Sequence, residues 1–268
     1  MSPVGTVGRP KRRRLGQNFL VDPGIARRIV ALLEDEPPRV LEIGPGRGAL
    51  TEPLVERFAE VRALELDPEL VAPLAERFAG TGLEIRHDDA LVTDLGEVAG
   101  DGPWQVASNL PYSVGTAILR RLMPRHDCFT RLVVMLQREV AERVVAEPGE
   151  RAHGLMALER SAWAEARVAF TVHPKAFRPV PKVTSAVLVL ELRPPPASPE
   201  RLRRALGIAA GALTRPRKMV ANALRTTGAP EALEAAGLDP RARPGQFGLK
   251  DWLCLEAALV RRAEGDPK

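Results

Sequence analysis

The sequence has little of what a disulfide-rich, metal-binding or membrane protein needs. Its two cysteines, Cys128 and Cys254, lie far apart and form no Cys-x-x-Cys pair, which argues against a disulfide framework or a zinc site. The four histidines also lack the spacing of metal ligands, so we expect no metal. No apolar run approaches the length of a bilayer-spanning helix, and none follows the basic N-terminus as in a secretory signal. We therefore expect a cytoplasmic protein with no membrane partner.

The composition indicates a soluble globular protein with a substantial core. The 268 residues are 45% hydrophobic, which suits one large domain or an ordinary domain with a small second one. Short β-rich runs alternate with segments whose apolar residues recur at three- and four-residue spacing, and this pattern predicts an α/β fold with a parallel, doubly wound sheet. The predicted strands are 40–43, 61–66, 83–87, 105–108 and 132–136, and the predicted helices include 49–58, 68–78 and 114–122.

The second half of the chain changes character twice. A predicted helix over 152–164 is followed by two β-rich runs, 168–172 and 185–192, which we expect to form an antiparallel hairpin at one sheet edge. The prolines of 194–199 then predict a stiff extended connector. Everything beyond this connector has helical spacing. We therefore expect a basic N-terminal arm over 1–21, a sheet domain over 22–193 and a small α-helical domain over 200–268.

Positive charge is concentrated in two zones. The formal net charge of +5 divides into +6 for residues 1–28, −6 for 29–196, +6 for 197–230 and −1 for the remainder. Two basic zones that flank an acidic body suggest a polyanion held at both edges. A composition that places arginine on every solvated face would give the same totals, so charge alone leaves both interpretations open.

A glycine-rich turn follows the first predicted strand and opens a helix. Gly44 and Gly46 permit the tight turn and let the backbone approach a ligand closely. Together with Ala49 they also fit the Gly-x-Gly-x-x-Gly/Ala pattern of dinucleotide sites, so the turn alone is ambiguous. Acids follow at the ends of the next two strands. Glu65 can accept hydrogen bonds from both ribose hydroxyls, and Asp89 can accept one from an adenine amine.

Three consecutive strand ends of this kind would cradle a nucleoside. No second mononucleotide half follows residue 136, which favours S-adenosylmethionine over NAD as the cofactor. Helix N-caps or plain surface charges remain the alternative for Glu65 and Asp89.

Asn109-Leu110-Pro111-Tyr112 stands at the end of another predicted strand and suits a flat base with an exocyclic amine. The Asn109 amide oxygen and the Leu110 carbonyl can both accept from an NH2 group, Pro111 fixes the backbone, and Tyr112 offers a ring for stacking. The pattern favours adenine recognition by a nucleic-acid methyltransferase. An ordinary Asn-x-Pro turn with a core tyrosine is the alternative for these four residues alone.

Five segments occur along the chain in a fixed order. They are Gly16-Gln17-Asn18-Phe19-Leu20, the glycine turn of 42–49, Asn109-Leu110-Pro111-Tyr112, Gln137-Arg138-Glu139-Val140-Ala141-Glu142-Arg143, and Pro174-Lys175-Ala176-Phe177-Arg178-Pro179-Val180-Pro181-Lys182-Val183. In this order they resemble the motifs of ribosomal RNA adenine dimethyltransferases of the KsgA type, and the resemblance covers nearly the whole chain.

The resemblance implies a Rossmann-like class I methyltransferase fold with a mostly parallel seven-stranded sheet and a small C-terminal helical domain. It implies a site that binds S-adenosylmethionine. The implied cofactor residues are Asn18, Leu20, Gly44, Gly46, Glu65, Asp89 and Asn109. Asn109 and Leu110 would hold the target amine, and Tyr112 and Phe177 would sandwich the adenine. A core position that pins the proline-rich loop is the alternative for Phe177.

The resemblance also implies an RNA partner. The family dimethylates two adjacent adenosines in the loop of the hairpin near the 3′ end of small-subunit rRNA, and it serves in subunit assembly. The implied partner is therefore 16S rRNA within the immature small ribosomal subunit, bound by a monomer. The expected RNA-binding side chains are Arg12, Arg13, Arg14, Arg215, Arg217 and Lys218.

Two departures from the family pattern stand out. Ser113 replaces a frequent asparagine, and we expect it to cap the helix that begins there. Pro216 and Ala221 replace basic residues, which removes positive charge from the expected RNA-facing segment.

Two other functions fit parts of the sequence. One is a macrolide-resistance methyltransferase that acts on large-subunit rRNA, against which Leu110 and the segment 137–143 favour the KsgA type. The other is a non-catalytic RNA-binding assembly factor on the same fold. The retained site residues Gly44, Glu65, Asp89 and Asn109 favour an active enzyme.

Overall fold

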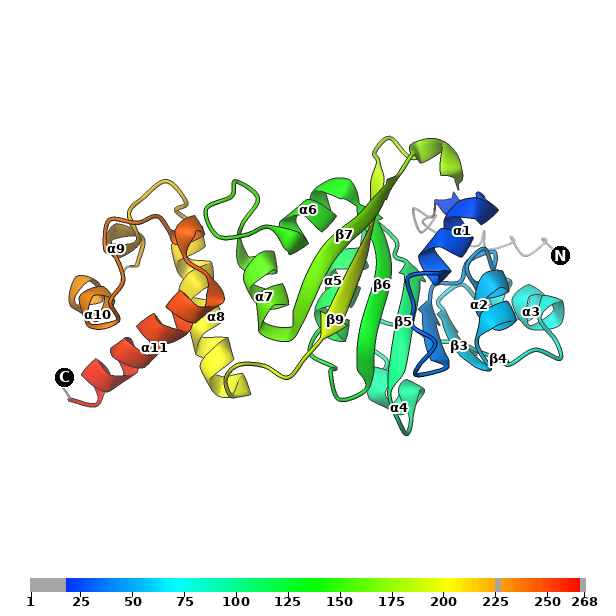
Figure 1. Cartoon of the computed structure of the whole chain (residues 1–268), viewed down its shortest axis with the longest axis horizontal. Coiled ribbons are helices and arrows are strands. Elements are labelled where there is room, and N and C mark those ends of the chain that lie inside the picture. The colour runs from blue at the N-terminus through cyan, green and yellow to red at the C-terminus, as the bar shows by residue number, and fades with distance from the viewer. Residues whose placement is uncertain (1–17, 225–227, 266–268) are drawn as a thin grey trace, which may run out of the picture.

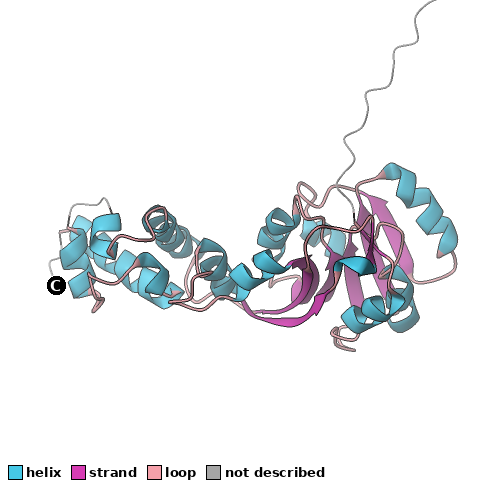
Figure 2. Cartoon of the chain, turned by 90° about the horizontal axis from the view of Figure 1, so that it is seen from above, coloured by secondary structure: helices cyan, strands magenta, loops and turns pink. Residues whose placement is uncertain are grey.

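A computed structural model describes residues 18–224 and 228–265. The chain forms one large sheet with helices on both faces, followed by a group of helices beyond the last strand (Figure 1). Seen from above, the sheet body and these C-terminal helices lie side by side along the long axis of the molecule (Figure 2). No helix within the described ranges is long and apolar enough to cross a membrane.

The main sheet has seven strands in the order β4-β3-β2-β5-β6-β9-β7. The pairs from β4 through to β6 are parallel, whereas β9 runs antiparallel to both β6 and β7. This confirms the predicted mostly parallel sheet. The strands are β2 (Arg39–Ile43), β3 (Glu60–Glu65), β4 (Leu83–His87), β5 (Trp104–Asn109), β6 (Phe129–Gln137), β7 (Ala164–Val172) and β9 (Ser185–Leu192).

The predicted hairpin is present at the sheet edge as β7 and β9. Strand β7 begins earlier than the expected residue 168, because residues 164–168 already pair with 188–192 of β9. The helix before it is correspondingly shorter than expected and ends at Trp163. The order of the strands also shows that β9 returns inside β7, which leaves β7 as the outermost strand.

Helices cover the two faces of the sheet in separate hydrophobic clusters. Ile118 of α5 packs in one cluster with Leu41, and Ile29 of α1 packs in the other with Val40, so neighbouring residues of β2 point to opposite faces. The helices of the sheet body are α1 (Pro23–Val30), α2 (Thr51–Arg57), α3 (Pro68–Arg77), α4 (Leu95–Ala99), α5 (Gly115–Leu122), α6 (Arg138–Val145) and α7 (Leu155–Trp163).

Helix starts follow local chemistry where a short acid precedes them. Asp22 accepts from the backbone N–H groups of Gly24 and Ile25, and Asp67 and Asp94 cap α3 and α4 in the same way. The expectation that Ser113 caps α5 is wrong. That helix begins at Gly115 behind Val114 and has no side-chain cap.

A second, two-stranded sheet joins distant parts of the chain. Strand β1 (Phe19–Leu20) pairs antiparallel with β8 (Phe177–Arg178), which follows the short 3₁₀ helix η1 (Pro174–Ala176). Val21 continues the attachment by donating from its backbone N–H to the carbonyl of Ala176 at 2.8 Å. The start of the described chain is thereby held against the segment that leads into β9.

Beyond Arg193 the described chain forms helices joined by loops, with no strand. Trp252 is fully buried in a third hydrophobic cluster, to which α7 contributes Leu158 and Ala162, so the last helices pack against the sheet body through α7. The elements are α8 (Pro199–Leu213), α9 (Val220–Ala223), α10 (Ala229–Ala235), η2 (Pro244–Gln246) and α11 (Leu249–Ala263). The domain boundaries at 21, 193 and 199 remain predictions.

Candidate active site

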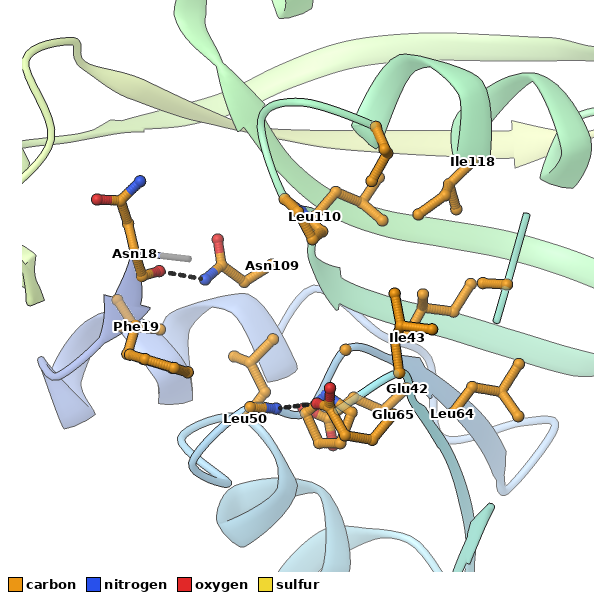
Figure 3. A pocket seen from close by; sticks show the side chains of 18 of the residues that line it. Asn18, Phe19, Glu42, Ile43, Leu50, Leu64, Glu65, Asn109, Leu110 and Ile118 are labelled. Atoms are coloured by element: carbon orange, nitrogen blue, oxygen red, sulfur yellow. Dashed lines mark hydrogen bonds between the residues drawn. The ribbon is translucent and has the colours of Figure 1, made fainter. Parts of the chain in front are cut away.

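A pocket opens at the carboxyl ends of β2, β3 and β5 (Figure 3). The chain runs from β2 outward to β4 on one side and then resumes with β5 on the other, so the pocket lies at the point where the strand order reverses. Ligands of open α/β sheets bind at such switch points. The lining residues come from 18–20, 42–47, 49–50, 64–66, 88–91 and 109–114, together with Ile118.

The glycine turn forms one wall of this pocket through its backbone. Gly44 and Gly46 have φ values of 68° and 60°, which an L side chain rarely adopts. A Cβ on Gly46 would also lie 3.1 Å from the Phe19 ring, so this position has little room for a side chain. Both predicted glycines line the pocket, and their role of close backbone approach to a ligand stays a prediction.

Glu65 is fixed to the backbone around it. Its side chain is buried, Oε2 accepts from the N–H of Gly46 at 2.9 Å, and Oε1 accepts from the N–H of Asp67 at 2.8 Å. Each carboxylate oxygen has a second lone pair for a ligand hydroxyl. The bond to Gly46 also ties the glycine turn to the end of β3, so the same carboxylate can shape the pocket and receive a ligand.

Asp89 lies in the loop after β4, the strand that neighbours β3. Its Oδ1 accepts from the N–H of Leu91 at 2.8 Å, which orients the carboxylate. Arg121 of α5 donates to the carbonyls of Leu91 and Thr93 and so fastens this loop to the helix behind it. Asp89 thus lines the pocket with its orientation set by backbone contacts.

Glu42 is a pocket residue that the sequence prediction missed. It is 1% exposed, and its Oε2 accepts from the Thr51 hydroxyl at 2.7 Å. Burial raises the pKa of Glu42 to about 8, the Thr51 bond lowers it, and the nearby Glu65 raises it. A carboxyl residue inside an otherwise apolar strand, between Leu41 and Ile43, was the available signal.

Asn109 and Asn18 meet across the pocket although they lie far apart in sequence. The Asn109 side-chain Nδ2 donates to the Asn18 carbonyl at 3.2 Å (Figure 3). Because the nitrogen of the amide is engaged, Oδ1 of Asn109 is the atom that can accept from a ligand. Asn18, Leu20 and Asn109 all line the pocket, as predicted residues of one site. Leu110 lines it too, with its side chain buried and its N–H donated to the Met135 carbonyl.

Tyr112 presents a half-buried ring to the same pocket. Its hydroxyl and the Ser185 hydroxyl are 2.6 Å apart, which anchors the ring to the start of β9. Burial raises the pKa of Tyr112, and the bond with Ser185 lowers it. The Pro111 carbonyl accepts from the N–H groups of Val114 and Gly115, so the turn is closed by backbone alone. A proline-fixed turn that carries an anchored aromatic ring can offer a stacking face.

Phe177 does not lie beside Tyr112 in the way a sandwich requires. Its side chain is fully buried in the core cluster of α1 and α2, it pairs through β8 with Leu20, and it does not line the pocket. The placement agrees with the core alternative, because the hydrophobic face of β8 turns inward. A stacking role for Phe177 needs a rearrangement and stays a prediction.

The predicted RNA-binding side chains are not part of this pocket. Arg215, Arg217 and Lys218 lie in the turn between α8 and α9, within the C-terminal helices (Figure 1). Arg217 and Lys218 are exposed and form no ion pair among residues 18–224 and 228–265. Arg12, Arg13 and Arg14 lie outside the described residues. Nor does any group of three His, Cys, Asp or Glu side chains in those same ranges have the arrangement of a metal site.

A mostly parallel sheet with a glycine-lined, acidic pocket at its switch point defines a class I S-adenosylmethionine-dependent methyltransferase. The model of the ribosomal RNA adenine dimethylase family matches residues 8–255. The chain therefore belongs to the ribosomal RNA adenine dimethylase family and is an S-adenosylmethionine-dependent rRNA adenine dimethyltransferase. Gly44, Gly46, Glu65 and Asp89 fit this cofactor, because they supply close backbone and carboxylate acceptors.

Similar proteins cover nearly the whole chain. It is 41% identical to the ribosomal RNA small subunit methyltransferase A of Magnetococcus marinus, over 88% of this chain and 87% of that protein. It is 38% identical to the protein of the same name from Methylococcus capsulatus, over 92% of this chain and 97% of that protein.

Two solved structures share the fold. One is the 23S rRNA methyltransferase ErmE, with a TM-score of 0.69 and 26% identity over 91% of this chain and 100% of that one. A dimethyladenosine transferase from Plasmodium falciparum has a TM-score of 0.77 and 20% identity, over 92% and 98%, and so shows the fold alone.

Proposed function

We propose that this enzyme dimethylates the N6 amines of two adjacent adenosines in the 3′-terminal hairpin loop of 16S rRNA, and that it serves in small-subunit biogenesis. One observation supports this most directly. The Asn109 amide, held by the Asn18 carbonyl, borders the same pocket as Glu65 and Asp89. An acceptor for an exocyclic amine therefore lies within the cavity that holds the methyl donor.

The chemistry asks the protein mainly to position and polarise the amine. The lone pair of an adenine N6 is delocalised into the ring, whereas the bound cofactor supplies a reactive sulfonium methyl group. Acceptors at Asn109 Oδ1 and the Leu110 carbonyl would hold the two amine hydrogens and stabilise the positive charge that develops on nitrogen. Tyr112 would stack on the base and offset part of its unstacking, since such contacts contribute about 1 to 3 kcal/mol per base.

The relatives favour the small subunit as the target. Those with 37% to 41% identity are named small subunit methyltransferases, whereas the 23S rRNA methyltransferase ErmE is 26% identical. Transfer of tritium from labelled S-adenosylmethionine to isolated small and large subunits tests the assignment. We expect label in small-subunit adenosines only. Label in the large subunit would support the macrolide-resistance alternative, and no label in either would support the non-catalytic one.

We further propose that basic side chains hold the RNA outside the pocket. Arg217 and Lys218, with Arg215, would contact rRNA from the C-terminal helices, and Arg12, Arg13 and Arg14 would do so from the N-terminal arm. The protein would act as a cytoplasmic monomer. Reversal of all three arm arginines to glutamate should weaken RNA binding and its salt dependence while calorimetry shows unchanged cofactor affinity. Unchanged RNA binding would remove the arm from the interface.

Contacts at several points favour a folded target. We expect an immature small subunit to be methylated faster than a mature one or the isolated hairpin at matched salt, because only the assembled RNA would reach the pocket and both basic zones together. Loop adenosines that are already unpaired also lower the cost of flipping. Equal rates on the three substrates would contradict this proposal.

A further inference from the structure

Glu42 differs from the other carboxylates of the pocket. Glu65 has both oxygens bonded to backbone N–H groups, and Asp89 has one. Glu42 is more than nine-tenths buried, receives only the Thr51 hydroxyl on Oε2, and has no partner for Oε1 among the described residues. Because Glu42 also lines the pocket, this second oxygen is available to whatever occupies it.

The charged groups around Glu42 are mostly of its own sign. Glu65 approaches from β3, Asp88 and Asp89 line the pocket from the loop after β4, and Arg47 is the one basic lining residue. The Arg47 guanidinium lies over the Phe19 ring, 4.7 Å from its centroid. Burial raises the pKa of Glu42 to about 8, with Thr51 lowering it and Glu65 raising it. At neutral pH, burial therefore favours the protonated form of Glu42.

The two forms of the cofactor that would occupy the pocket lined by Glu42 differ by one charge. S-adenosylmethionine carries a sulfonium cation, whereas the product S-adenosylhomocysteine has a neutral thioether. A cation that enters a buried site favours the ionised form of a neighbouring carboxyl group. We propose that Glu42 loses its proton to solvent when S-adenosylmethionine binds and regains it when the neutral product remains, and that this exchange favours the methyl donor over the product.

The step is balanced without any further reactant. On donor binding, the O–H bond of Glu42 breaks, the electron pair stays on the carboxylate, and the proton passes to the buffer. After methyl transfer the reverse step leaves a neutral acid beside a neutral sulfur. Proton exchange at Glu42 needs only the cofactor and does not depend on which RNA is methylated. A failed RNA methylation assay would therefore contradict the proposed function, whereas a failed cofactor-binding assay would contradict the role of Glu42.

Calorimetry without RNA tests the proposal. Titration at pH 7 in buffers of different ionisation enthalpy counts the protons released by S-adenosylmethionine and by S-adenosylhomocysteine. For the wild type we expect close to one proton for the donor and clearly fewer for the product. The donor dissociation constant should then fall up to about tenfold per pH unit between pH 6 and 8. Glu42→Gln should abolish both the extra proton and the pH dependence.

Variants of Thr51 provide a second test that leaves Glu42 in place. Thr51→Val removes the donor that stabilises ionised Glu42 and should move proton release to higher pH, whereas Thr51→Ser keeps the hydroxyl and should behave as the wild type. These variants decide the matter if Glu42→Gln does not fold. Three outcomes would each overturn the proposal. The two ligands could release equal numbers of protons, or Glu42→Gln could retain the release. Thr51→Val could also leave the pH at the midpoint of proton release unchanged.

Discussion

The pocket and the C-terminal helices handle buried charge in opposite ways. In the pocket, the Glu65 carboxylate is held by backbone N–H groups, and no basic side chain of the described residues pairs with it. In the helices, Glu256 is 1% exposed and pairs with two arginines, Arg201 at 3.2 Å and Arg204 at 2.6 Å. An acid bonded to the backbone still accepts ligand donors, whereas an acid paired with arginines is neutralised. The first arrangement suits binding, and the second suits packing.

The ion pairs of Glu256 also reduce the number of basic side chains that are candidates for RNA contact. Arg201 and Arg204 belong to the basic zone seen in the sequence, yet they serve an internal ion pair. Arg217 and Lys218 are exposed without such a partner in the described residues. Of this zone, the turn between α8 and α9 is therefore the better candidate for RNA contact.

The largest expected effect lies at the side of the pocket that we propose binds the target base. Asn109→Ala should lower methyl transfer about 100- to 1000-fold, because it removes an acceptor aimed at developing charge. RNA affinity, measured by filter binding, should change little. Single-turnover rates with saturating cofactor provide the readout. Wild-type turnover in a folded variant would contradict the role of Asn109.

A smaller effect should follow at the cofactor side. Glu65→Ala removes the carboxylate that binds both Gly46 and Asp67, so we expect S-adenosylmethionine affinity to fall about 10- to 100-fold, as for lost hydrogen bonds to a charged group. Calorimetry gives the dissociation constant. Glu60→Ala, on the same strand but at its other end, is the matched control and should bind the cofactor normally. Equal losses in both variants would point to general damage to β3.

Replacing the exposed cations of the C-terminal helices should have a smaller effect, on RNA binding and not on cofactor binding. Arg217→Ala with Lys218→Ala should weaken RNA binding about tenfold or less and reduce the slope of log affinity against log salt by about two. Cofactor affinity should stay unchanged. The control pair is Arg77→Ala with Arg86→Ala, which removes two positive charges from α3 and β4 at the far sheet edge. If the control pair changed the slope of log affinity against log salt by the same amount, RNA binding would depend only on the net charge of the protein.

A different kind of effect, on the stability of the fold, is expected without cofactor. Unfolded Glu42 has a pKa near 4.5 and folded Glu42 near 8, so between these values unfolding releases a proton. This contribution to stability is fully present below pH 4.5 and is lost as pH rises to about 8, at about 1.4 kcal/mol per pH unit. Thermal melts of Glu42→Gln should therefore depend less on pH than those of the wild type across this range. Parallel curves for the two proteins would contradict the raised pKa.

The parts that could be predicted from sequence are those set by strand order. Parallel strands end at one sheet edge, so Glu65, Asp89 and Asn109 could be expected in one pocket from their positions after β-rich runs. The orientation of Asn109 could not, because its partner is the carbonyl of Asn18, far away in the chain. The protonation of Glu42 depends on burial by the assembled fold, which no local pattern reports.

Two differences between the expected and the observed placement of residues have local physical causes. Ser113 has the chemistry of a cap, but the Pro111 carbonyl already accepts from the first N–H groups of the helix, and the helix starts two residues later. Phe177 stands among prolines, which suggested an exposed loop, yet pairing of β8 with β1 turns its ring into the core. This pairing could not be predicted from the amino-acid pattern, because each strand is only two residues long.

The pairing of β1 with β8 has a consequence for synthesis on the ribosome. Leu20 lines the pocket and is translated long before its partner strand, which contains Phe177 and Arg178. This wall of the pocket therefore cannot form until about two thirds of the given sequence has been translated. At roughly 5 to 20 residues per second, a nascent chain spends several seconds with this wall missing. Completion of this pocket wall is thus a late event in the synthesis of each new molecule.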